Sequence, residues 1–495
     1  MKNDSFGEVK ETKFIHAVIP LTFLVCILTY TIRYTQASPH IPIIISGMLA
    51  VFIAMFVLKY KWAYLIEGIL NTIKSSMEAV LILLVIGMLV GSWIISGVVP
   101  TMIFYGLKII SPSIFLPAAL ILSLIVALTT GNSWSTAATI GIALMGIGAG
   151  LGIPPQITAG AIISGAYMGD KLSPLSDTTN LAPAMAGSDI FEHIKAMLYT
   201  TIPSFIITII LFIFIGRKYS DIGVDTESLN KIFVVLNQEF NITPLLFIIP
   251  LITIVLVVKK VPAIPGLFCG TLIGGVGAVI FQGATVKDFI TALQIGYVSN
   301  SGNQFVDELL TRGGMNSMMW TVTLIICALF LGGAMERAKM LSAVANKVLS
   351  IAKSTGSLIL ATVFTSIATN ILAAEQYLSI VITGRIYKDA YASRNLHPTT
   401  LSRVLEDAGT MTSPLIPWNS CGAYMMAALG IAPWIYVPYC FLNLINPIIS
   451  IIYGYTGFSI RYIDSTKAKK IRLKVYLLQI FLENKKLVFK IKKRF

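Results

Sequence analysis

The sequence predicts an all-α polytopic membrane protein. Of its 495 residues, 56% are hydrophobic and only 12% are charged, and the mean hydropathy is +0.81. A soluble domain carries about one charged residue in four. Apolar windows recur along the chain. Many of them are about 18–20 residues long and can therefore cross a bilayer as helices. They include residues 14–32, 41–58, 79–98, 202–215, 245–258, 318–335 and 433–453. We expect about 12 transmembrane helices, within a range of roughly 10–14.

An internal repeat divides the chain into five segments. Aligning the sequence with itself at an offset of about 240 residues places similar residues opposite one another in the same order, as duplicated halves do. The matching pairs are Glu67 with Glu308, Gly91 with Gly332, Thr129 with Thr369, and Ser-Pro-Leu at 173–175 with Ser-Pro-Leu at 413–415. The expected segments are an N-terminus with two leading spans (1–61), a first repeat (62–215), a connector with about two spans (216–302), a second repeat (303–456) and a basic tail (457–495).

The basic residues predict that the two halves are inverted in the membrane. Lys59, Lys61 and Lys74 precede the apolar window 79–98. The corresponding window 318–335 is instead followed by basic residues, namely Arg337, Lys339, Lys347 and Lys353. Because basic residues are retained in the cytoplasm, the first window runs outward and its counterpart runs inward. Inverted repeats with broken helices or re-entrant hairpins are typical of secondary transporters. Both chain termini are expected in the cytoplasm.

The net charge of +14 does not indicate a nucleic-acid partner. Much of it lies in the tail 461–495, directly after the apolar windows. Basic residues in that place are typical of a cytoplasmic anchor that contacts anionic lipid. The five cysteines stand singly in apolar segments, with neither metal-ligand spacing nor a disulfide framework. We expect no cofactor.

A polar break in the first half is the main candidate for a cation site. The segment 169–180 reads Gly-Asp-Lys-Leu-Ser-Pro-Leu-Ser-Asp-Thr-Thr-Asn and places two carboxylates in an apolar region. A carboxylate within a membrane is costly and is a functional-site hypothesis by default. Broken helices are tolerated at that depth only where they line a cavity or are buried in protein. The candidate ion-binding residues of this break are Asp170, Asp177, Thr178, Thr179 and Asn180, and an earlier polar run at 129–136 adds Asn132 and Ser133.

The second half carries its own polar break at 406–419. Its candidate residues are Asp407, Thr410, Thr412, Ser413 and Asn419. The acids of the two halves do not align, so the expected site is chemically asymmetric. Sodium prefers oxygen ligands, and we expect it at Asp177, Thr178, Asn180 and Asp407. A buried carboxylate binds a proton more readily than an exposed one, so sodium and protons can compete for the same groups.

Structural roles compete with this interpretation. Lys171 follows Asp170 directly and could neutralise it as a structural pair, and a hydroxyl such as that of Ser133 often only bonds to a neighbouring helix. Glu406 stands close to Arg403 in the sequence and is interpreted as a solvated or paired side chain. Glu78 is interpreted as interfacial. Asp177 has no basic neighbour in the sequence and is the strongest candidate.

Four motifs carry a resemblance to a known family. Two are long and contain the Ser-Pro-Leu triplets, at 164–183 and 405–424. The others are Gly-Asn-Ser-Trp-Ser-Thr-Ala-Ala-Thr-Ile at 131–140 and Asn-Leu-Ile-Asn-Pro-Ile-Ile-Ser at 443–450. With these motifs the chain resembles the NhaC-type sodium/proton antiporters, a family whose relatives include sodium-linked malate/lactate antiporters. The resemblance covers about residues 14–460, and it implies sodium efflux coupled to proton entry across a bacterial plasma membrane.

The sequence is compatible with two other functions. A sodium- or proton-coupled exchanger of small organic anions, such as malate or lactate, or of amino acids could use the same scaffold. An intramembrane aspartyl protease would need two carboxylates that share a proton, and the repeated Ser-Pro-Leu breaks give no reason for that chemistry. We therefore expect a transporter and not an enzyme. Its expected partners are sodium, protons and the lipid bilayer, with an organic anion as the alternative cargo, and a homodimer is compatible with the sequence.

Overall fold

The predicted all-α class is confirmed. The structure, a computed structural model, describes residues 10–35, 38–220, 226–259 and 261–463, and these form helices and no β-strand. Most of the basic tail expected at 457–495 lies outside the described residues. The two leading helices are α1 (Phe14–Tyr30) and α2 (His40–Phe52), and α3 (Trp62–Ser75) begins the first half.

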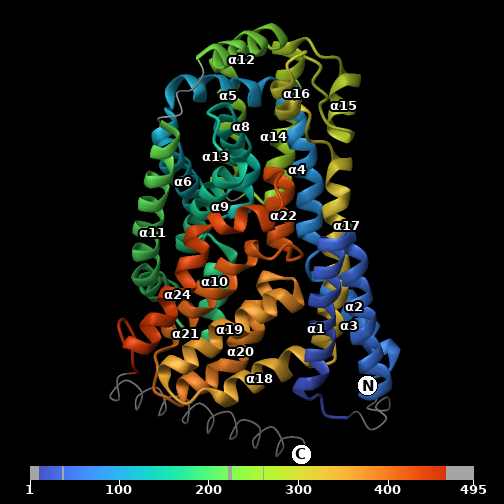
Figure 1. Cartoon of the computed structure of the whole chain (residues 1–495), viewed down its shortest axis with the longest axis vertical. Coiled ribbons are helices and arrows are strands. Elements are labelled where there is room, and N and C mark those ends of the chain that lie inside the picture. Colours follow the sequence, from blue (N-terminus) through green and yellow to red (C-terminus); the bar gives the residue numbers. More distant parts are fainter. Residues whose placement is uncertain (1–9, 36–37, 221–225, 260, 464–495) are drawn as a thin grey trace, which may run out of the picture.

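The helices of the two halves follow one another in a similar order (Figure 1). The first half contains α4 (Met77–Ile95), α5 (Val98–Ile109), α6 (Pro112–Thr130), α7 (Ser133–Thr136), α8 (Ile142–Gly150), α9 (Pro155–Leu172), α10 (Asp177–Ala186) and α11 (Ile190–Ser220). The second half contains α17 (Met319–Arg337), α18 (Met340–Ile351), α19 (Thr355–Ala373), α20 (Gln376–Ala392), α21 (Pro398–Val404), α22 (Ser420–Leu429), α23 (Pro433–Tyr436) and α24 (Phe441–Thr456).

A connector joins the halves. It consists of α12 (Thr226–Glu239), α13 (Ile248–Val258), α14 (Ala263–Gln282) and α15 (Val286–Gln294), and α16 (Gln304–Leu310) begins the second half. Short π-helical turns are η1 (Thr31–Thr35), η2 (Ile53–Val57), η3 (Ala137–Gly141) and η6 (Leu405–Thr410). Short 3₁₀ turns are η4 (Pro244–Phe247), η5 (Met315–Met318), η7 (Ser413–Leu415) and η8 (Val437–Tyr439). Single π-turns are rare and are often found at functional sites.

Seven helices in the described part of the chain are long and apolar enough to cross a membrane. The number rises to nine if each of two sharply bent helix pairs is counted as one span. The predicted count of about 12 is therefore not confirmed. Four further apolar helices, α1, α5, α18 and α24, have only 10–17 residues, and of these α1 and α24 lie in apolar windows that the sequence predicted as spans.

The outer faces of the long helices are apolar. On α11, for example, Ile206, Ile210 and Phe214 are exposed, and they lie about one helical turn apart, on one face of the helix. In water such a patch would invite aggregation, whereas in a bilayer it contacts lipid tails. The chain is a multi-pass membrane protein.

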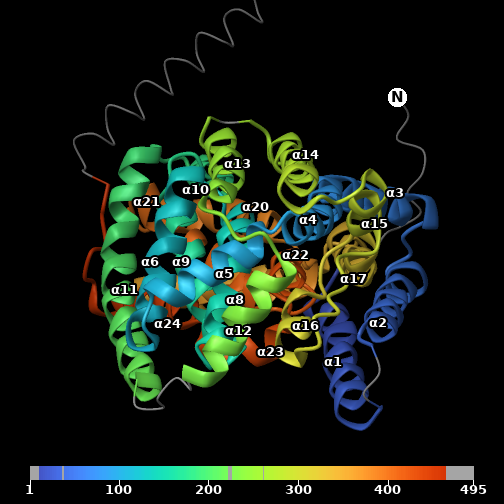
Figure 2. The same cartoon turned by 90° about the horizontal axis from the view of Figure 1, so that it is seen from above.

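Helices of matching length lie at opposite ends of the molecule. Helices α4, α5 and α6 have 19, 12 and 19 residues, and α17, α18 and α19 have the same three lengths. Helix α5 lies near the upper end in Figure 1 and α18 near the lower end. Seen from above, α2 and α3 pack beside α17 on one flank, and α6, α9 and α11 form the other flank (Figure 2).

Candidate functional site

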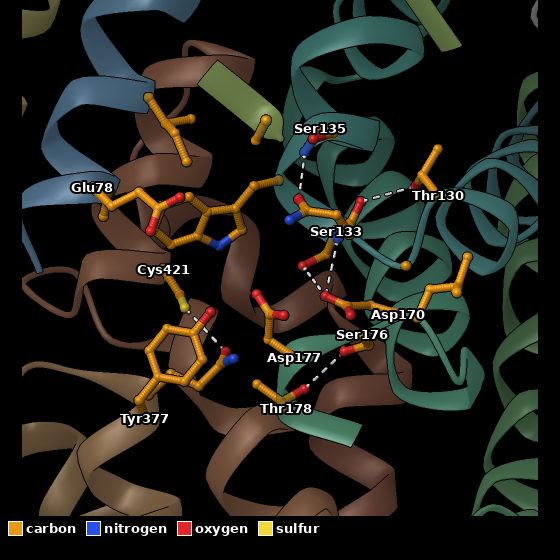
Figure 3. A pocket seen from close by; sticks show the side chains of 18 of the residues that line it. Glu78, Thr130, Ser133, Ser135, Asp170, Ser176, Asp177, Thr178, Tyr377 and Cys421 are labelled. Carbon is orange, nitrogen blue, oxygen red and sulfur yellow. Dashed lines mark hydrogen bonds between the residues drawn. The ribbon is translucent and has the colours of Figure 1, made fainter. Parts of the chain in front are cut away.

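Polar breaks from both halves meet at a cavity of about 710 Å³. Its wall is formed by the α6–α7 and α9–α10 breaks of the first half and by the α19–α20 break and α22 of the second. The α3–α4 and α13–α14 junctions complete it. Figure 3 shows Asp170, Asp177, Ser133 and Tyr377 around the space. A pocket in which a few polar groups converge is the usual form of a binding site.

The α9–α10 break is built by its own sequence. Pro174 has no N–H to donate and disfavours helical geometry at Ser173 before it, so α9 ends at Leu172. Helix α10 restarts at Asp177 with Ser176 as its N-cap, whose hydroxyl accepts a hydrogen bond from the Thr179 N–H. This sequence therefore places the amino end of a helix beside the cavity.

Two of the predicted ion ligands in this break also hold the backbone in place. The Thr179 hydroxyl donates to the Lys171 carbonyl oxygen at 3.0 Å. The side-chain amide of Asn180 donates to the carbonyl oxygens of Pro174 and Ser176, at 3.0 and 2.7 Å. Thr178 and Asn180 line the cavity, whereas Thr179 is buried behind it.

Asp170 is anchored by the neighbouring α6–α7 break. The backbone N–H and the hydroxyl of Ser133 both donate to Asp170 Oδ2, at 2.9 and 2.7 Å. Asn132 is the N-cap of α7, with its Oδ1 accepting from the Ser135 N–H at 2.8 Å. Gly131 has a φ of +68°, and a β-carbon there would clash with Leu175 of the other break. The two breaks therefore pack directly against one another and bring Asp170, Asn132 and Ser133 to the same cavity.

Asp177 is the least constrained acid of the site. It lines the cavity, it is exposed there, and no described residue donates a hydrogen bond to its carboxylate. It occupies the first turn of α10, where the helix dipole favours a negative charge. Asp170 is close enough for the two charges to affect each other, and Figure 3 shows both beside the same space.

The candidate residues of the second half lie behind the cavity wall. Thr412 accepts from the side-chain amide of Asn370 at 3.1 Å and donates to the Ala408 carbonyl oxygen at 2.6 Å. The Ser413 hydroxyl bonds to Gln376 Oε1 at 2.7 Å, and Asn419 is the N-cap of α22. Thr410 is fully buried. None of these four residues is among the described residues that line the cavity, and the hydrogen bonds of Thr412, Ser413 and Asn419 stabilise the break around it.

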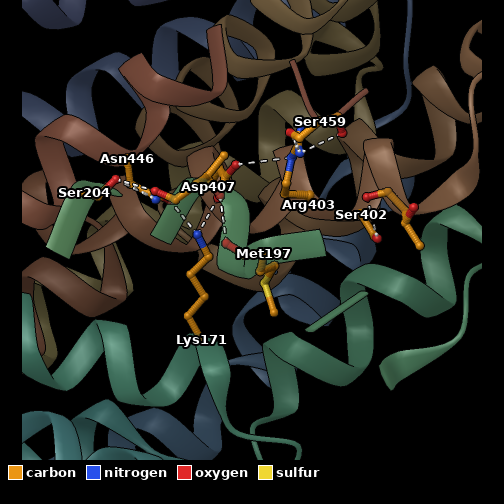
Figure 4. Close-up of polar contacts among 10 residues, drawn as sticks. Lys171, Met197, Ser204, Ser402, Arg403, Asp407, Asn446 and Ser459 are labelled. Carbon is orange, nitrogen blue, oxygen red and sulfur yellow. Dashed lines mark hydrogen bonds and ion pairs between the residues drawn. The ribbon is translucent and has the colours of Figure 1, made fainter. Parts of the chain in front are cut away.

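Asp407 belongs to a separate buried cluster (Figure 4). It forms an ion pair with Lys171, and both side chains are fully buried. The Lys171 ammonium also donates to Asn446 Oδ1 at 2.5 Å, and the Thr200 hydroxyl donates to Asp407 Oδ1 at 2.9 Å. Arg403 Nε lies 3.9 Å from Asp407 Oδ2. Of the four expected sodium ligands, the structure thus brings Asp177, Thr178 and Asn180 together and places Asp407 apart from them.

The same cluster identifies the ion-pair partner of Lys171, which the sequence alone did not determine. Lys171 is the partner of Asp407 and not of its neighbour Asp170. Successive residues on a helix point about 100° apart, so the two side chains leave α9 in different directions. Asp170 reaches the cavity and Lys171 reaches the second half of the chain.

Two further acids of the cavity are not among the candidate ion ligands predicted from the sequence. Glu375 is the N-cap of α20 and accepts a hydrogen bond from the Ser76 hydroxyl at 3.1 Å. Glu78, interpreted as interfacial, lines the cavity as well. A polar pair at 375–376 inside an apolar stretch was the available signal for Glu375. Glu78 shows no comparable signal, because it precedes an apolar window like an ordinary boundary residue.

The interpretation of Glu406 as a solvated or paired side chain is wrong. Its side chain is 0% exposed, and neither carboxylate oxygen has a hydrogen-bond partner among the described residues. Arg403 instead turns toward Asp407 and donates to Ser459 Oγ at 2.6 Å.

Comparisons with known proteins agree with a transporter. Residues 165–458 match the Na⁺/H⁺ antiporter family. The Na⁺/H⁺ antiporter NhaC of Alkalihalophilus pseudofirmus is 38% identical over 89% of this chain and 95% of its own length. The malate-2H⁺/Na⁺-lactate antiporter of Bacillus subtilis is 38% identical over 91% of this chain and 96% of its own. The arginine/ornithine antiporter ArcD of Halobacterium salinarum is 36% identical over 92% of this chain and 94% of its own.

These matches extend over nearly the whole described structure and include both polar breaks. They confirm the resemblance that the motifs indicated, and they join sodium/proton antiporters with exchangers of organic solutes in one group. The protein belongs to the Na⁺/H⁺ antiporter family.

Proposed function

We propose that this protein exchanges sodium for protons across a bacterial plasma membrane. One observation carries the proposal most directly. Four carboxylates, those of Glu78, Asp170, Asp177 and Glu375, line the cavity, and no lysine, arginine or histidine is among its described lining residues. Such a concentration of negative charge in a partly desolvated space attracts cations and repels anions. The similarity of this chain to Na⁺/H⁺ antiporters such as NhaC of Alkalihalophilus pseudofirmus also supports the proposal.

The proposed sodium site lies where the two breaks of the first half meet. Asp170 and Asp177 supply carboxylate oxygens, and Thr178 and Asn180 supply neutral oxygens on the same cavity wall. Asp170 replaces Asp407 in the ligand set expected from the sequence, because Asp407 is engaged by Lys171. Ser133 fixes the orientation of Asp170 by its two hydrogen bonds.

Competition for these carboxylates would couple the two ions. Two neighbouring carboxylates in a desolvated place favour uptake of a cation, and either a proton or sodium can supply the charge. The site then releases protons when sodium binds, and it takes up protons when sodium leaves. No separate proton pathway is required for this minimum cycle.

The direct test is transport by the purified protein in liposomes that contain a pH-sensitive dye. External sodium is expected to make the interior alkaline, because inward sodium drives protons outward. Malate, lactate, arginine and ornithine are added singly in the same assay. An absence of any sodium-driven pH change, with a response to one of these solutes instead, would refute sodium/proton exchange. Liposomes without protein provide the baseline.

Exchange of a cationic amino acid is the second candidate. The cavity volume of about 710 Å³ is within the range of small-molecule pockets and is far larger than one sodium ion needs. The same four carboxylates would attract a guanidinium or ammonium group, whereas they disfavour malate and lactate. Arginine uptake into ornithine-loaded liposomes without sodium would favour this function.

We further propose that the two halves, 62–215 and 303–456, are inverted repeats, with both termini in the cytoplasm. Matching helix lengths support this arrangement, as do the positions of α5 and α18 at opposite ends of the molecule. The basic residues that follow α17 favour a cytoplasmic location for α18.

This topology predicts how single cysteines will react. Lys108 on α5 and Lys347 on α18 are both exposed. In a background without the five native cysteines, a cysteine at 108 should react with a membrane-impermeant maleimide in intact cells. A cysteine at 347 should react only after the membrane is opened. If both positions react from the same side, the inverted arrangement is wrong, although the cation site could still stand.

A further inference from the structure

One side of the cavity is not used by the proposed sodium site. It is formed by the α3–α4 junction and by the first residues of α7, α20 and α22. Figure 3 shows Glu78, Cys421 and Tyr377 on the left of the cavity, away from Asp170 and Ser133. We call the following lining residues the aromatic side of the cavity: Glu78, Trp134, Glu375, Tyr377 and Cys421.

Hydrogen bonds hold the elements of the aromatic side together. The Cys421 thiol donates to Gln376 Oε1 at 3.1 Å, and Gln376 stands between Glu375 and Tyr377 at the start of α20. The Ser76 hydroxyl, at the α3–α4 junction, donates to Glu375 Oε2 at 3.1 Å. Three separate elements, namely α20, α22 and the α3–α4 junction, are therefore fixed beside one another around the same part of the cavity.

Trp134 has one ring face covered and the other free. Tyr424 covers the first face, with 4.1 Å between the ring centroids and 25° between the ring planes. The Tyr424 hydroxyl donates to the Trp134 carbonyl oxygen at 2.8 Å, and Tyr424 is fully buried. Trp134 itself is only partly buried and lines the cavity, so the exposed part of its indole faces that space. Because Tyr424 follows Cys421 by about one turn of α22,, the indole lies beside the other residues of the aromatic side.

Tyr377 adds a second aromatic ring. It is 44% exposed and lines the cavity. No described lysine or arginine lies over the ring of Trp134 or over that of Tyr377. The face of an aromatic ring attracts a cation, and quaternary ammonium groups are well-known ligands of such faces. The two rings, one from each half of the chain, are therefore available to a cation that enters from solution.

Two acids of the aromatic side supply the negative charge that such a cation needs. Glu375 is buried as the N-cap of α20, and Glu78 is exposed two residues after Ser76, the hydrogen-bond donor to Glu375. Sodium prefers a shell of oxygen ligands, whereas this side presents two rings and a thiol besides its carboxylates. A quaternary ammonium group has no N–H to donate and is stabilised by ring faces and nearby negative charge. The aromatic side therefore suits an organic cation better than it suits sodium.

We propose that the aromatic side of the cavity binds the methylated ammonium group of a small organic cation such as choline. The rings of Trp134 and Tyr377 contact its methyl groups, and Glu78 and Glu375 balance its charge. A ligand without a carboxylate fits best, because no lysine, arginine or histidine is among the described lining residues to pair with one. The inference goes beyond sodium/proton exchange, since it adds a class of ligand and requires no proton movement. Sodium and the organic cation would share one cavity of about 710 Å³, so each should weaken the binding of the other.

The test is equilibrium binding of radioactive choline to the purified full-length protein in detergent, in a sodium-free buffer. We expect saturable binding that tetramethylammonium displaces. The neutral alcohol in which carbon replaces the choline nitrogen has the same shape without the charge, and it should not displace choline. An absence of saturable binding by the folded protein would overturn the proposal, as would equal displacement by this alcohol. Stronger displacement by arginine than by tetramethylammonium would show that the ligand class is wrong.

Ring variants test whether choline binds at the aromatic side. Tyr377→Leu and Trp134→Leu should each weaken choline binding roughly tenfold, which is the size of a desolvated cation–ring contact. Tyr377→Phe and Trp134→Phe keep an aromatic ring and should stay within about threefold of wild type. Trp320→Leu is the matched control and should bind like wild type, because Trp320 is 41% exposed, packs on His40 and is not among the described cavity residues. Equal binding by the folded leucine and phenylalanine variants would overturn the proposal.

A charge variant keeps the proposal testable if a ring variant does not fold. Glu78 is an exposed residue of the cavity wall, so Glu78→Gln should leave the fold intact. It should weaken choline binding about threefold, the usual size of an interaction with an exposed charge. Glu308→Gln removes an acid of α16 that is not among the described cavity residues, and it should bind choline like wild type. Equal binding by these two variants would overturn the assigned role of Glu78 and with it the proposed site.

The outcomes also separate this proposal from sodium/proton exchange, because the binding assay needs no transport. Choline binding without any sodium-driven proton movement would refute the proposed function and leave the organic-cation site standing. Sodium/proton exchange by a protein that binds no choline would have the opposite meaning. Where both activities are observed, choline binding that sodium does not displace would show that the two ligands do not share the cavity, and the proposed site would be wrong.

Discussion

Replacement of Asp177 by asparagine should reduce sodium-driven proton movement to less than about one tenth of the wild-type rate. A charge-assisted ligand contributes about 1.5–3 kcal/mol, and about 1.4 kcal/mol already corresponds to a factor of ten. The asparagine keeps the size of the side chain and removes its charge. Because no described residue donates a hydrogen bond to the Asp177 carboxylate, the loss should not come from a damaged fold. The measurement is the pH-dye assay in liposomes, at several sodium concentrations.

The control for this variant is Glu308→Gln. Glu308 is an exposed acid on α16 that accepts a hydrogen bond from Gln304 at 2.9 Å. Its neutralisation changes the net charge of the protein by the same amount, and exchange should remain at the wild-type rate. If Asp177→Asn kept half or more of the wild-type exchange, Asp177 would not be a carrier of sodium or protons. Asp170 would then have to serve as the principal acid.

Composition and local sequence pattern were sufficient to predict that this protein is an all-α membrane protein. Apolar windows predicted α2, α4 and α17, since a lipid-facing helix needs a continuous apolar sequence. The Ser-Pro dipeptide at 173–174 predicted the end of α9, because proline restricts the residue before it. The number of membrane spans was harder to predict from the sequence. Helices such as α5 and α18 have only 12 residues each, and they do not show as separate windows of bilayer length.

The candidate site was predicted in part. The sequence identified Asp170, Asp177 and the hydroxyls around them, because polar residues in an apolar stretch stand out without any structure. It could not identify their partners. Lys171 and Asp407 are 236 positions apart in the sequence, and local pattern therefore offered the adjacent Asp170 as a possible partner of Lys171 but could not offer Asp407.

Adjacent acids were also assigned to the wrong surroundings for a geometric reason. Glu406 and Asp407 are neighbours in the chain, yet Asp407 contacts Lys171, whereas the Glu406 carboxylate has no hydrogen-bond partner among the described residues. The directions of successive side chains on a helix differ by about 100°, and a π-turn alters that angle further. Burial of each acid therefore depends on packing between distant helices, which no short segment of sequence records.

Neutralising one member of the Lys171–Asp407 pair should strongly destabilise the protein. Breaking a buried ion pair from one side leaves an uncompensated charge and costs about 3–5 kcal/mol. In Asp407→Asn, the buried cations Lys171 and Arg403 lose the carboxylate that faces both. In Lys171→Gln, Asp407 keeps the hydrogen bond from Thr200, but its nearest described cation is then the more distant Arg403, at 3.9 Å. Both single variants should lose monodisperse protein at lower temperature than wild type when heated in detergent.

The double variant Lys171→Gln with Asp407→Asn should recover part of this stability, because one buried cation, Arg403, is left without its carboxylate in place of two. It contains neither charge, and its two amides can still bond to each other and to Asn446, which lies 2.5 Å from the Lys171 ammonium. The matched comparison is Lys171→Gln with Asp170→Asn, which neutralises the sequence neighbour instead. That double variant should remain as unstable as Lys171→Gln alone, because Asp170 is held by Ser133 and not by Lys171. Rescue by Asp170→Asn without rescue by Asp407→Asn would contradict the pairing. Rescue of stability without recovery of exchange would show that the pair also takes part in transport, since the fold would then be intact while the buried charges that link α9 to η6 were missing.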